Sequence, residues 1–201
     1  MHWTIWAVGG VGIALAVAAA VMGSDEYVKP VQPGKINVSV YNDLGKLVPV
    51  SSERVIKPEA EWKTLLSPKQ YEIMRKAGTE RPGTCGLLNN KEPGCYTCAA
   101  CGLPLFYAGT KFESGTGWPS FFEPIASGNV TEHEDTSFGM VRTEVNCARC
   151  GSHLGHVFDD GPPPTHKRYC MNGEALNFTA ADKLATLADP AAKNAPATQP
   201  K

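Results

Sequence analysis

The chain has 201 residues, of which 42% are hydrophobic and 19% charged, and its formal net charge is −1 at pH 7. A chain of this length can bury one ordinary hydrophobic core, so we expect one domain with appendages at its ends. The balanced charge and the absence of a Lys/Arg run argue against a surface for nucleic acid or anionic membranes, which needs a basic stripe to displace counterions.

Residues 1–23 have a composition of their own. The stretch from Ile5 to Met22 is uncharged and rich in Ala, Val and Gly. As a helix rising about 1.5 Å per residue it would reach about 27 Å, close to the apolar thickness of a bilayer. We therefore expect a membrane anchor or a signal peptide. The uncleaved anchor is favoured, because cleavage after residues 18–20 (Ala-Ala-Ala) would leave an apolar Val-Met pair behind. Both alternatives predict a membrane-anchored or exported domain outside the cytoplasm, in the periplasm if the source is bacterial.

Residues 24–57 are expected to be a linker followed by a β-hairpin extension. Residues 36–41 alternate between apolar and polar, and a second apolar run follows at residues 46–50. The residues between them, Asn-Asp-Leu-Gly, tolerate the positive φ angles of a tight turn. Pro49 lacks a backbone N–H, which limits its strand to a sheet edge.

Two short helices are predicted next, and then strands. The first covers residues 58–66. The second begins at Ser67, where a Ser-Pro-Lys-Gln run forms a capping box, and ends at Gly78. We expect both helices to pack on one side of a sheet and to lie outside the chemistry. From Gly78 to Ala180, short apolar runs alternate with Gly, Pro and Asn clusters, the pattern of antiparallel strands. The fold class is therefore mainly β, with a domain at 58–182 and a disordered Ala/Pro-rich tail at 183–201.

Two Cys-x-x-Cys pairs predict a structural zinc site. They are Cys98 with Cys101 and Cys147 with Cys150, and each pair is followed by glycine. Two thiolates on one tight turn can bind the same ion, and a second turn completes tetrahedral coordination. The alternatives are two disulfides or reduced cysteines in the core, and zinc is favoured over both.

The other three cysteines are Cys85, Cys95 and Cys170, and their odd number points to a reactive thiol. Cys170 stands two residues after Arg168, whose charge would favour the thiolate and lower the cysteine pKa. On a strand, Arg168, Cys170 and Asn172 would share one face. A small buried residue is the plainer interpretation of Cys170.

Two histidines, His153 and His156, are candidate acids, since the imidazole pKa lies near neutrality. Their spacing would place them together on a tight turn but on opposite faces of a regular strand. The alternatives are that one completes the zinc site or that one only bonds the loop.

Four motifs in this order resemble the methionine-R-sulfoxide reductases, the B-type peptide methionine sulfoxide reductases (MsrB family). They lie at residues 98–106, 111–121, 147–172 and 176–178, within a likeness that runs from about Trp62 to Phe178. The resemblance implies a β-tent of two antiparallel sheets with zinc at one end. It also implies that peptides or proteins carrying oxidised methionine are the substrates.

The resemblance also implies roles for residues. Cys170 would attack the sulfoxide sulfur and become a sulfenic acid. His156 would protonate the oxygen with His153 beside it, and Asp160 and Asn172 would orient this network. The pocket wall that contacts the S-methyl group would be Trp118, with Phe158 and Phe121 as possible neighbours. Two further histidines, His133 and His166, match no catalytic position.

The resolving thiol departs from the family pattern. Many relatives carry this cysteine where Thr116 stands here. Cys85 is the favoured substitute, and Cys95 and direct reduction of the sulfenic acid are the alternatives. Thioredoxin or a similar dithiol is the expected external reductant.

Two other functions compete with this interpretation. A non-catalytic, zinc-stabilised binding module would be expected to lack Cys170 or the histidines. A membrane-tethered thiol–disulfide oxidoreductase would need a free Cys-x-x-Cys, and both such pairs here fit zinc better.

Overall fold

The computed structural model describes residues 31–194, so the anchor or signal expected at 1–23 lies outside the described residues. Over the described range, no helix has the length and apolar character needed to cross a membrane. The mainly β fold class is confirmed, because sheets dominate and helices are few.

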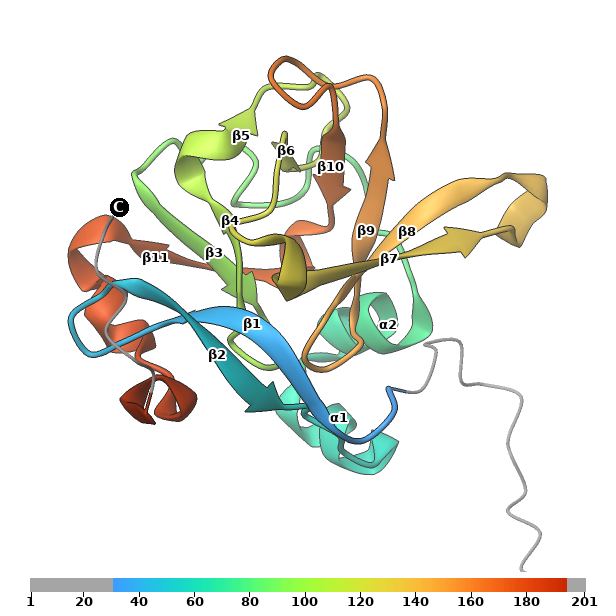
Figure 1. Ribbon diagram of the computed structural model, residues 1–201. Coiled ribbons are helices and arrows are strands. Elements are labelled where there is room, and N and C mark those ends of the chain that lie inside the picture. Colours follow the sequence, from blue (N-terminus) through green and yellow to red (C-terminus); the bar gives the residue numbers. More distant parts are fainter. Residues whose placement is uncertain (1–30, 195–201) are drawn as a thin grey trace, which may run out of the picture.

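Two antiparallel sheets form the body of the protein (Figure 1). The larger has the order β5-β6-β10-β9-β8-β7 and the smaller β11-β3-β4. The strands of the larger sheet are β5 (Lys111–Phe112), β6 (Ser120–Phe121), β7 (Val130–Asp135), β8 (Arg142–Cys147), β9 (His153–Phe158) and β10 (Arg168–Met171). Those of the smaller sheet are β3 (Gly94–Cys98), β4 (Pro104–Tyr107) and β11 (Leu176–Ala180). Short 3-10 turns connect them: η1 (Ala108–Thr110), η2 (Ser127–Asn129), η3 (Ser137–Gly139) and η4 (Gly173–Ala175).

Aromatic side chains join the two sheets. Phe121 of the larger sheet stacks on Phe106 of the smaller one, with ring centroids 4.4 Å apart, and both are fully buried. Tyr96 meets Phe121 edge-on at 5.0 Å. Phe121 therefore belongs to the core, which corrects the expectation that it shares the substrate pocket.

The N-terminal hairpin is part of the same core. β1 (Lys35–Tyr41) pairs antiparallel with β2 (Leu47–Glu53), where the alternation predicts a hairpin. Its inward valines, Val38, Val40, Val48 and Val50, belong to one buried cluster with the aromatic residues of the sheets. The Asn129 side chain bonds both the N–H and the C=O of Ser39, at 2.8 and 2.7 Å. The hairpin is therefore integrated into the domain and is not a detached extension.

The two helices lie at one end of the sheets (Figure 1). They are α1 (Glu59–Leu65) and α2 (Pro68–Lys76), and the capping box at Ser67 is present. The end of α2 differs from the prediction, because Ala77 and not Gly78 takes the left-handed conformation, with φ 51°. Gly78 instead allows the chain to pass close to the backbone of α2, because a Cβ there would stand 2.8 Å from the carbonyl oxygen of Glu72.

The C-terminal segment corrects a second expectation. The composition predicts a disordered tail from residue 183, yet residues 183–194 lie in η5 (Ala181–Leu187) and η6 (Pro190–Asn194) and the link between them. Asp189 forms an ion pair with Arg149, and its N–H donates to the carbonyl of Tyr41 at 2.9 Å. Ala192 is buried. The segment has no helical periodicity of its own, and contacts with residues distant in sequence fix its place.

Candidate active site and metal centre

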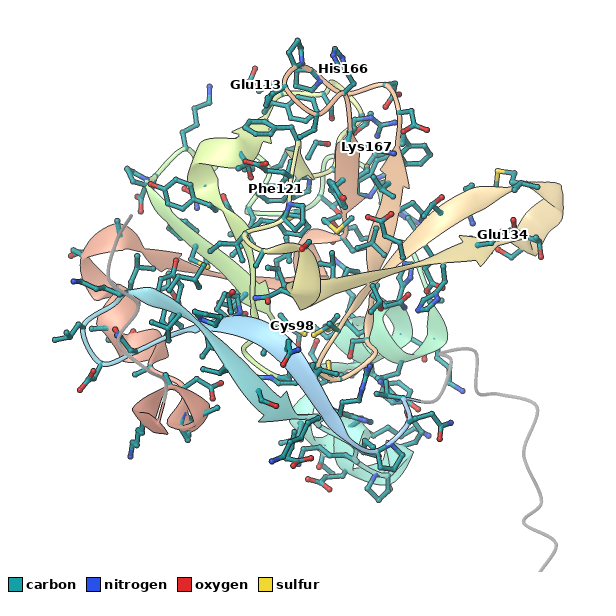
Figure 2. The ribbon with its side chains drawn as sticks, in the orientation of Figure 1. Cys98, Glu113, Phe121, Glu134, His166 and Lys167 are labelled. Carbon is teal, nitrogen blue, oxygen red and sulfur yellow. The ribbon has the colours of Figure 1, made fainter. Side chains whose placement is uncertain are left out.

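The four cysteines of the two Cys-x-x-Cys pairs converge on one point. Their sulfur atoms all lie within 4.8 Å of one another. The Cys98 and Cys150 sulfurs are 3.7 Å apart, and those of Cys101 and Cys147 are 3.5 Å apart. A tetrahedral zinc ion with Zn–S bonds of about 2.3 Å requires sulfurs about 3.8 Å apart, whereas a disulfide requires about 2 Å. The donor set therefore fits structural zinc, and none of the seven cysteines forms a disulfide. Figure 2 labels Cys98, with yellow sulfur atoms close by.

Each Cys-x-x-Cys pair forms a tight turn, or zinc knuckle, and the two knuckles are built alike. The N–H of Gly102 donates to the carbonyl of Cys98, and that of Gly151 to the carbonyl of Cys147, both at 2.8 Å. Each glycine has a φ slightly above 70°, which L residues avoid. One knuckle links β3 to β4 and the other links β8 to β9, so the metal would tie the two sheets together.

Arginines surround the metal centre. Arg149 donates to the carbonyl of Cys101 at 2.5 Å, Arg54 to Ala148 at 2.8 Å and Arg75 to Cys150 at 3.3 Å. Four thiolates around one divalent ion would carry an excess negative charge, which these guanidinium groups would partly offset. Neither histidine contributes to the cluster, so the alternative of zinc ligation by histidine is wrong.

Cys170 lies on β10 between two neighbouring strands. Its register partners are His156 on β9 and Ser120 on β6. The cysteine is half-buried, and its sulfur is 3.8 Å from the Thr116 hydroxyl. Ser114 donates to or accepts from both hydroxyls, those of Thr116 and Ser120, at 2.8 Å each. A chain of hydroxyl groups thus lines one side of the thiol.

Burial raises the pKa of the Cys170 thiol above its ordinary value. The Thr116 hydroxyl, the charge of Arg168 and the Ser120 hydroxyl act in the opposite direction but do not outweigh burial. Arg168 therefore acts in the predicted direction, yet the resting group is a thiol and not the thiolate that the sequence suggests.

Asp160 holds Arg168 and does not contact the histidines. Its carboxylate accepts two bonds from the guanidinium, at 2.8 and 2.9 Å. The guanidinium also lies over the ring of Phe158, 4.3 Å from its centroid. Asp160 and Phe158 together fix the cation beside Cys170, and this differs from the orienting role that the resemblance implies for Asp160.

An irregularity in β9 brings the two histidines together. Gly155 pairs with Val145, but the next partner, Asn146, faces His153, so Leu154 is an extra residue without a partner on β8. This bulge places His153 and His156 on the same side, with ring centroids 5.5 Å apart. A regular strand would have separated them.

Each histidine is held by a carboxylate that sequence analysis did not identify. Nδ1 of His153 is 2.7 Å from Glu144, and Nε2 of His156 is 2.8 Å from Asp135. Arg142 donates to the same oxygen of Asp135 at 2.6 Å. Glu144 lies on β8, which leads into the second Cys-x-x-Cys turn and is mostly buried. An acidic residue in that position was the sequence signal that could have identified it.

These contacts shift the pKa values of the site. Burial lowers the pKa of His156, against the raising effect of Asp135. Burial by itself would raise the pKa of Glu144, but hydrogen bonds and the charge of His153 lower it overall. At neutral pH, Glu144 is therefore an anion and His156 a neutral imidazole beside a protonated thiol.

A cavity of about 240 Å³ opens beside the histidines. Its lining consists of Asp135, Ser137, Arg142, Glu144, His153 and His156, together with Lys76, Ala77 and Thr79. The last three end or follow α2, so the second helix contributes to the site and the expectation that it lies outside the chemistry is wrong. Nε2 of His153 is buried and has no partner among the atoms described, which leaves a polar atom free for a ligand or water.

Trp118 and Asn172 are joined through one further residue, Glu80. The indole N–H of Trp118 donates to the Glu80 carbonyl at 3.1 Å. The side-chain oxygen of Asn172 accepts from the Glu80 N–H at 3.0 Å, and its amide donates to the carbonyl of Leu154 at 3.1 Å. Trp118 is half-buried and Asn172 buried. Asn172 thus secures backbone segments, and these hydrogen bonds do not reach the histidine side chains.

The two spare cysteines differ in access. Cys95 is fully buried in β3, and burial raises its pKa to about 12. Cys85 is half-buried and packs on Gly173, because a Cβ on that glycine would meet the Cys85 sulfur at 1.7 Å. Gly173 lies three residues after Cys170. Cys85 is therefore the spare thiol beside the strand that carries Cys170.

The surface histidines take no part. His133 and His166 are both exposed, and His166 lies on the loop between β9 and β10 at the top of Figure 2.

The fold and site define a mainly β protein with a four-cysteine metal centre and a half-buried thiol opposite a carboxylate-held histidine. A model of the SelR domain matches residues 66–180, more than half of the chain, and the chain belongs to this family. The resemblance found in the sequence is thereby confirmed.

Three relatives show how close the likeness is. The chain is 57% identical over 129 residues to the peptide methionine sulfoxide reductase MsrB of Agrobacterium fabrum, covering 64% of this chain and 96% of that protein. It is 58% identical over 134 residues to the protein of that name from Methanosarcina barkeri, covering 67% and 94%. For the one from Pseudomonas putida strain W619, identity is 52% over 130 residues, covering 65% and 98%.

Proposed function

We propose that the chain is a peptide-methionine (R)-S-oxide reductase with Cys170 as its nucleophile. The observation that carries this proposal is the pairing of Cys170 with His156 across β10 and β9, in a chain more than 50% identical to enzymes named for this reduction. A non-catalytic module on the same scaffold is not favoured, because the thiol and both histidines are present.

The resting protonation states suggest how the first step proceeds. The Cys170 proton passes to the neutral imidazole of His156, and the thiolate sulfur bonds to the sulfoxide sulfur. The imidazolium then protonates the sulfoxide oxygen. The hydroxyl then shifts from the substrate sulfur to the Cys170 sulfur: the substrate S–O bond and the transient S–S bond break, an S–O bond to Cys170 forms, methionine leaves as the thioether, and Cys170 becomes a sulfenic acid. The indole of Trp118 contacts the S-methyl group, and Arg168 stabilises the thiolate.

A second thiol completes the cycle. The Cys85 sulfur attacks the sulfur of the Cys170 sulfenic acid, so an S–S bond forms, the S–O bond breaks, and the hydroxyl takes the Cys85 proton and leaves as water. A thioredoxin-type dithiol then reduces the Cys85–Cys170 disulfide and becomes a disulfide itself. The location of Cys85 against Gly173 supports this assignment over the buried Cys95.

The bound metal would be a structural zinc ion held by Cys98, Cys101, Cys147 and Cys150, and it would contribute folding free energy. For the whole chain, the apolar stretch at residues 5–22 supports a membrane-anchored or exported location with the domain outside the cytoplasm. Protease treatment of intact cells and the N-terminal sequence of the mature protein test this location.

The test of the activity uses two peptides that differ only in the epimer of methionine sulfoxide. The purified chain with dithiothreitol should reduce the R peptide and leave the S peptide unchanged. Equal turnover of both epimers, or turnover of neither, would refute the proposal.

A further inference from the structure

Glu80 stands where three segments of the site meet. It follows α2, and its side chain is buried, with only 4% of the residue exposed. Among residues 31–194 no Lys, Arg or His forms an ion pair with it; its partners are backbone groups. A buried carboxylate is costly unless hydrogen bonds satisfy it, so its contacts identify what it holds in place.

The carboxylate holds the backbone that follows Cys170. One oxygen accepts from the N–H of Gly173 at 2.6 Å, and the other accepts from the N–H of Glu174 at 3.1 Å. Successive backbone N–H groups form a concave site for an anion. These two residues begin η4, directly after Asn172, so the carboxylate fixes the exit of the strand that carries the nucleophile.

The main chain of Glu80 holds two side chains of the site. Its carbonyl accepts from the Trp118 indole, and its N–H donates to the Asn172 side chain. The residues after it pack on the same turn: the N–H of Gly83 donates to the carbonyl of Gly117 at 2.7 Å. A Cβ on Gly117 would stand 2.7 Å from Pro82, so these two turns leave no space between them.

We propose that Glu80 is a positioning residue of the reductase site. Its carboxylate locks the segment at residues 80–83 onto η4, and that segment in turn sets the indole of Trp118 and the amide of Asn172 relative to the Cys170 sulfur. This inference rests on the proposed function. A charge-assisted pair of bonds is well suited to this task, since catalytic geometry that shifts by about 1 Å can lose about 100-fold in rate.

Two substitutions of Glu80 remove the acceptor oxygens of its carboxylate in steps. E80Q keeps one acceptor oxygen but turns an amide N–H toward a backbone N–H, and E80A removes both acceptors. With dithiothreitol and the R-epimer peptide, kcat/KM should fall about 10-fold in E80Q and about 100-fold in E80A. Glu72, an exposed residue of α2, provides the matched control, and E72Q should stay within about twofold of the wild type.

A double-mutant cycle separates positioning from general destabilisation. If Glu80 acts through the indole, E80A should lower kcat/KM by less than about threefold in the W118F background. An equal loss in both backgrounds, or E80Q activity within about twofold of the wild type, overturns the proposal. Bound zinc is measured in every variant. If E80A does not fold, the near-isosteric E80Q still decides.

A second readout does not depend on activity. Hydrogen exchange at the Trp118 indole N–H should be faster in E80Q than in the wild type, while that of the buried Trp62 stays unchanged. Unchanged exchange at Trp118 contradicts the positioning role. If the wild type itself fails to reduce the R epimer, the proposed function fails. The exchange result still reports separately on whether Glu80 holds Trp118 in place.

Discussion

Cys170 and His156 face each other across the β10–β9 ladder, so their side chains lie on the same face of the six-stranded sheet. Burial raises the pKa of the thiol and lowers that of the imidazole, which keeps both groups neutral at rest. The pair can therefore exchange one proton without burying a net charge before the substrate arrives.

The nucleophile assignment predicts that Cys170→Ser abolishes reduction of the R-epimer peptide and leaves bound zinc and the unfolding midpoint unchanged. A hydroxyl is far less nucleophilic than a thiol, and the two side chains are similar in size. Turnover and zinc content of the same sample provide the measurement. Turnover that persists with dithiothreitol would assign the chemistry to another thiol.

The metal centre predicts that Cys98→Ser or Cys147→Ser loses the ion and destabilises the domain. Structural zinc contributes on the order of 10 kcal/mol in small domains, and here it would join β3–β4 to β8–β9. Metal analysis and thermal unfolding check the result. Native protein without zinc, with Cys98 and Cys101 in a disulfide, is the contrary outcome.

The resolving step predicts that Cys85→Ser stops multiple turnover with thioredoxin but still releases about one equivalent of methionine per enzyme, leaving Cys170 as sulfenic acid. The wild type after one turnover should contain a Cys85–Cys170 bond in a peptide map. Formation of this bond requires Cα atoms about 6 Å apart, and Gly83 and Gly86 allow their segment to move. A mapped Cys95–Cys170 bond, or normal cycling of the variant, would falsify the assignment.

The lowered pKa of His156 predicts a pH-dependent stability. The unfolded state binds a proton at this histidine first as the pH falls below its ordinary pKa of 6.5. The contribution of neutral His156 to folding stability is therefore complete above pH 6.5 and is lost as the pH falls through its folded-state pKa. His156→Gln should flatten the stability profile between about pH 7 and 5, whereas the exposed His133→Gln should not. Urea midpoints across this range are the measurement, and parallel profiles of the wild type and His156→Gln would contradict it.

The docked segment at residues 181–194 predicts that Asp189→Ala destabilises the protein by about 1–3 kcal/mol, because it removes the ion-pair partner of the buried Arg149. Asp182, an exposed residue of η5, is the matched control, and Asp182→Ala should have an effect below about 0.5 kcal/mol. Denaturant unfolding compares the three proteins. Equal midpoints would show that the segment after η5 adds nothing to stability.

The sequence by itself determined the features that local rules encode. The spacing of Cys98, Cys101, Cys147 and Cys150 specified one tetrahedral cluster, because each pair needs only its own turn and glycine. The capping box at Ser67, the hairpin and the mainly β class follow from equally local patterns. Cys170 stood out by elimination and through its motif.

Only the tertiary structure decided what holds these groups in place. Glu144, Asp135 and Glu80 belong to no motif, and the histidine or backbone groups that they hold lie on other strands or loops. A one-residue bulge at Leu154, set by pairing with β8, brings His153 and His156 to one side, where strand periodicity had separated them. The docking of Asp189 on Arg149 likewise joins residues distant in sequence. Local patterns define which turns a chain can form, but burial and hydrogen bonding between distant segments arise only when the core closes.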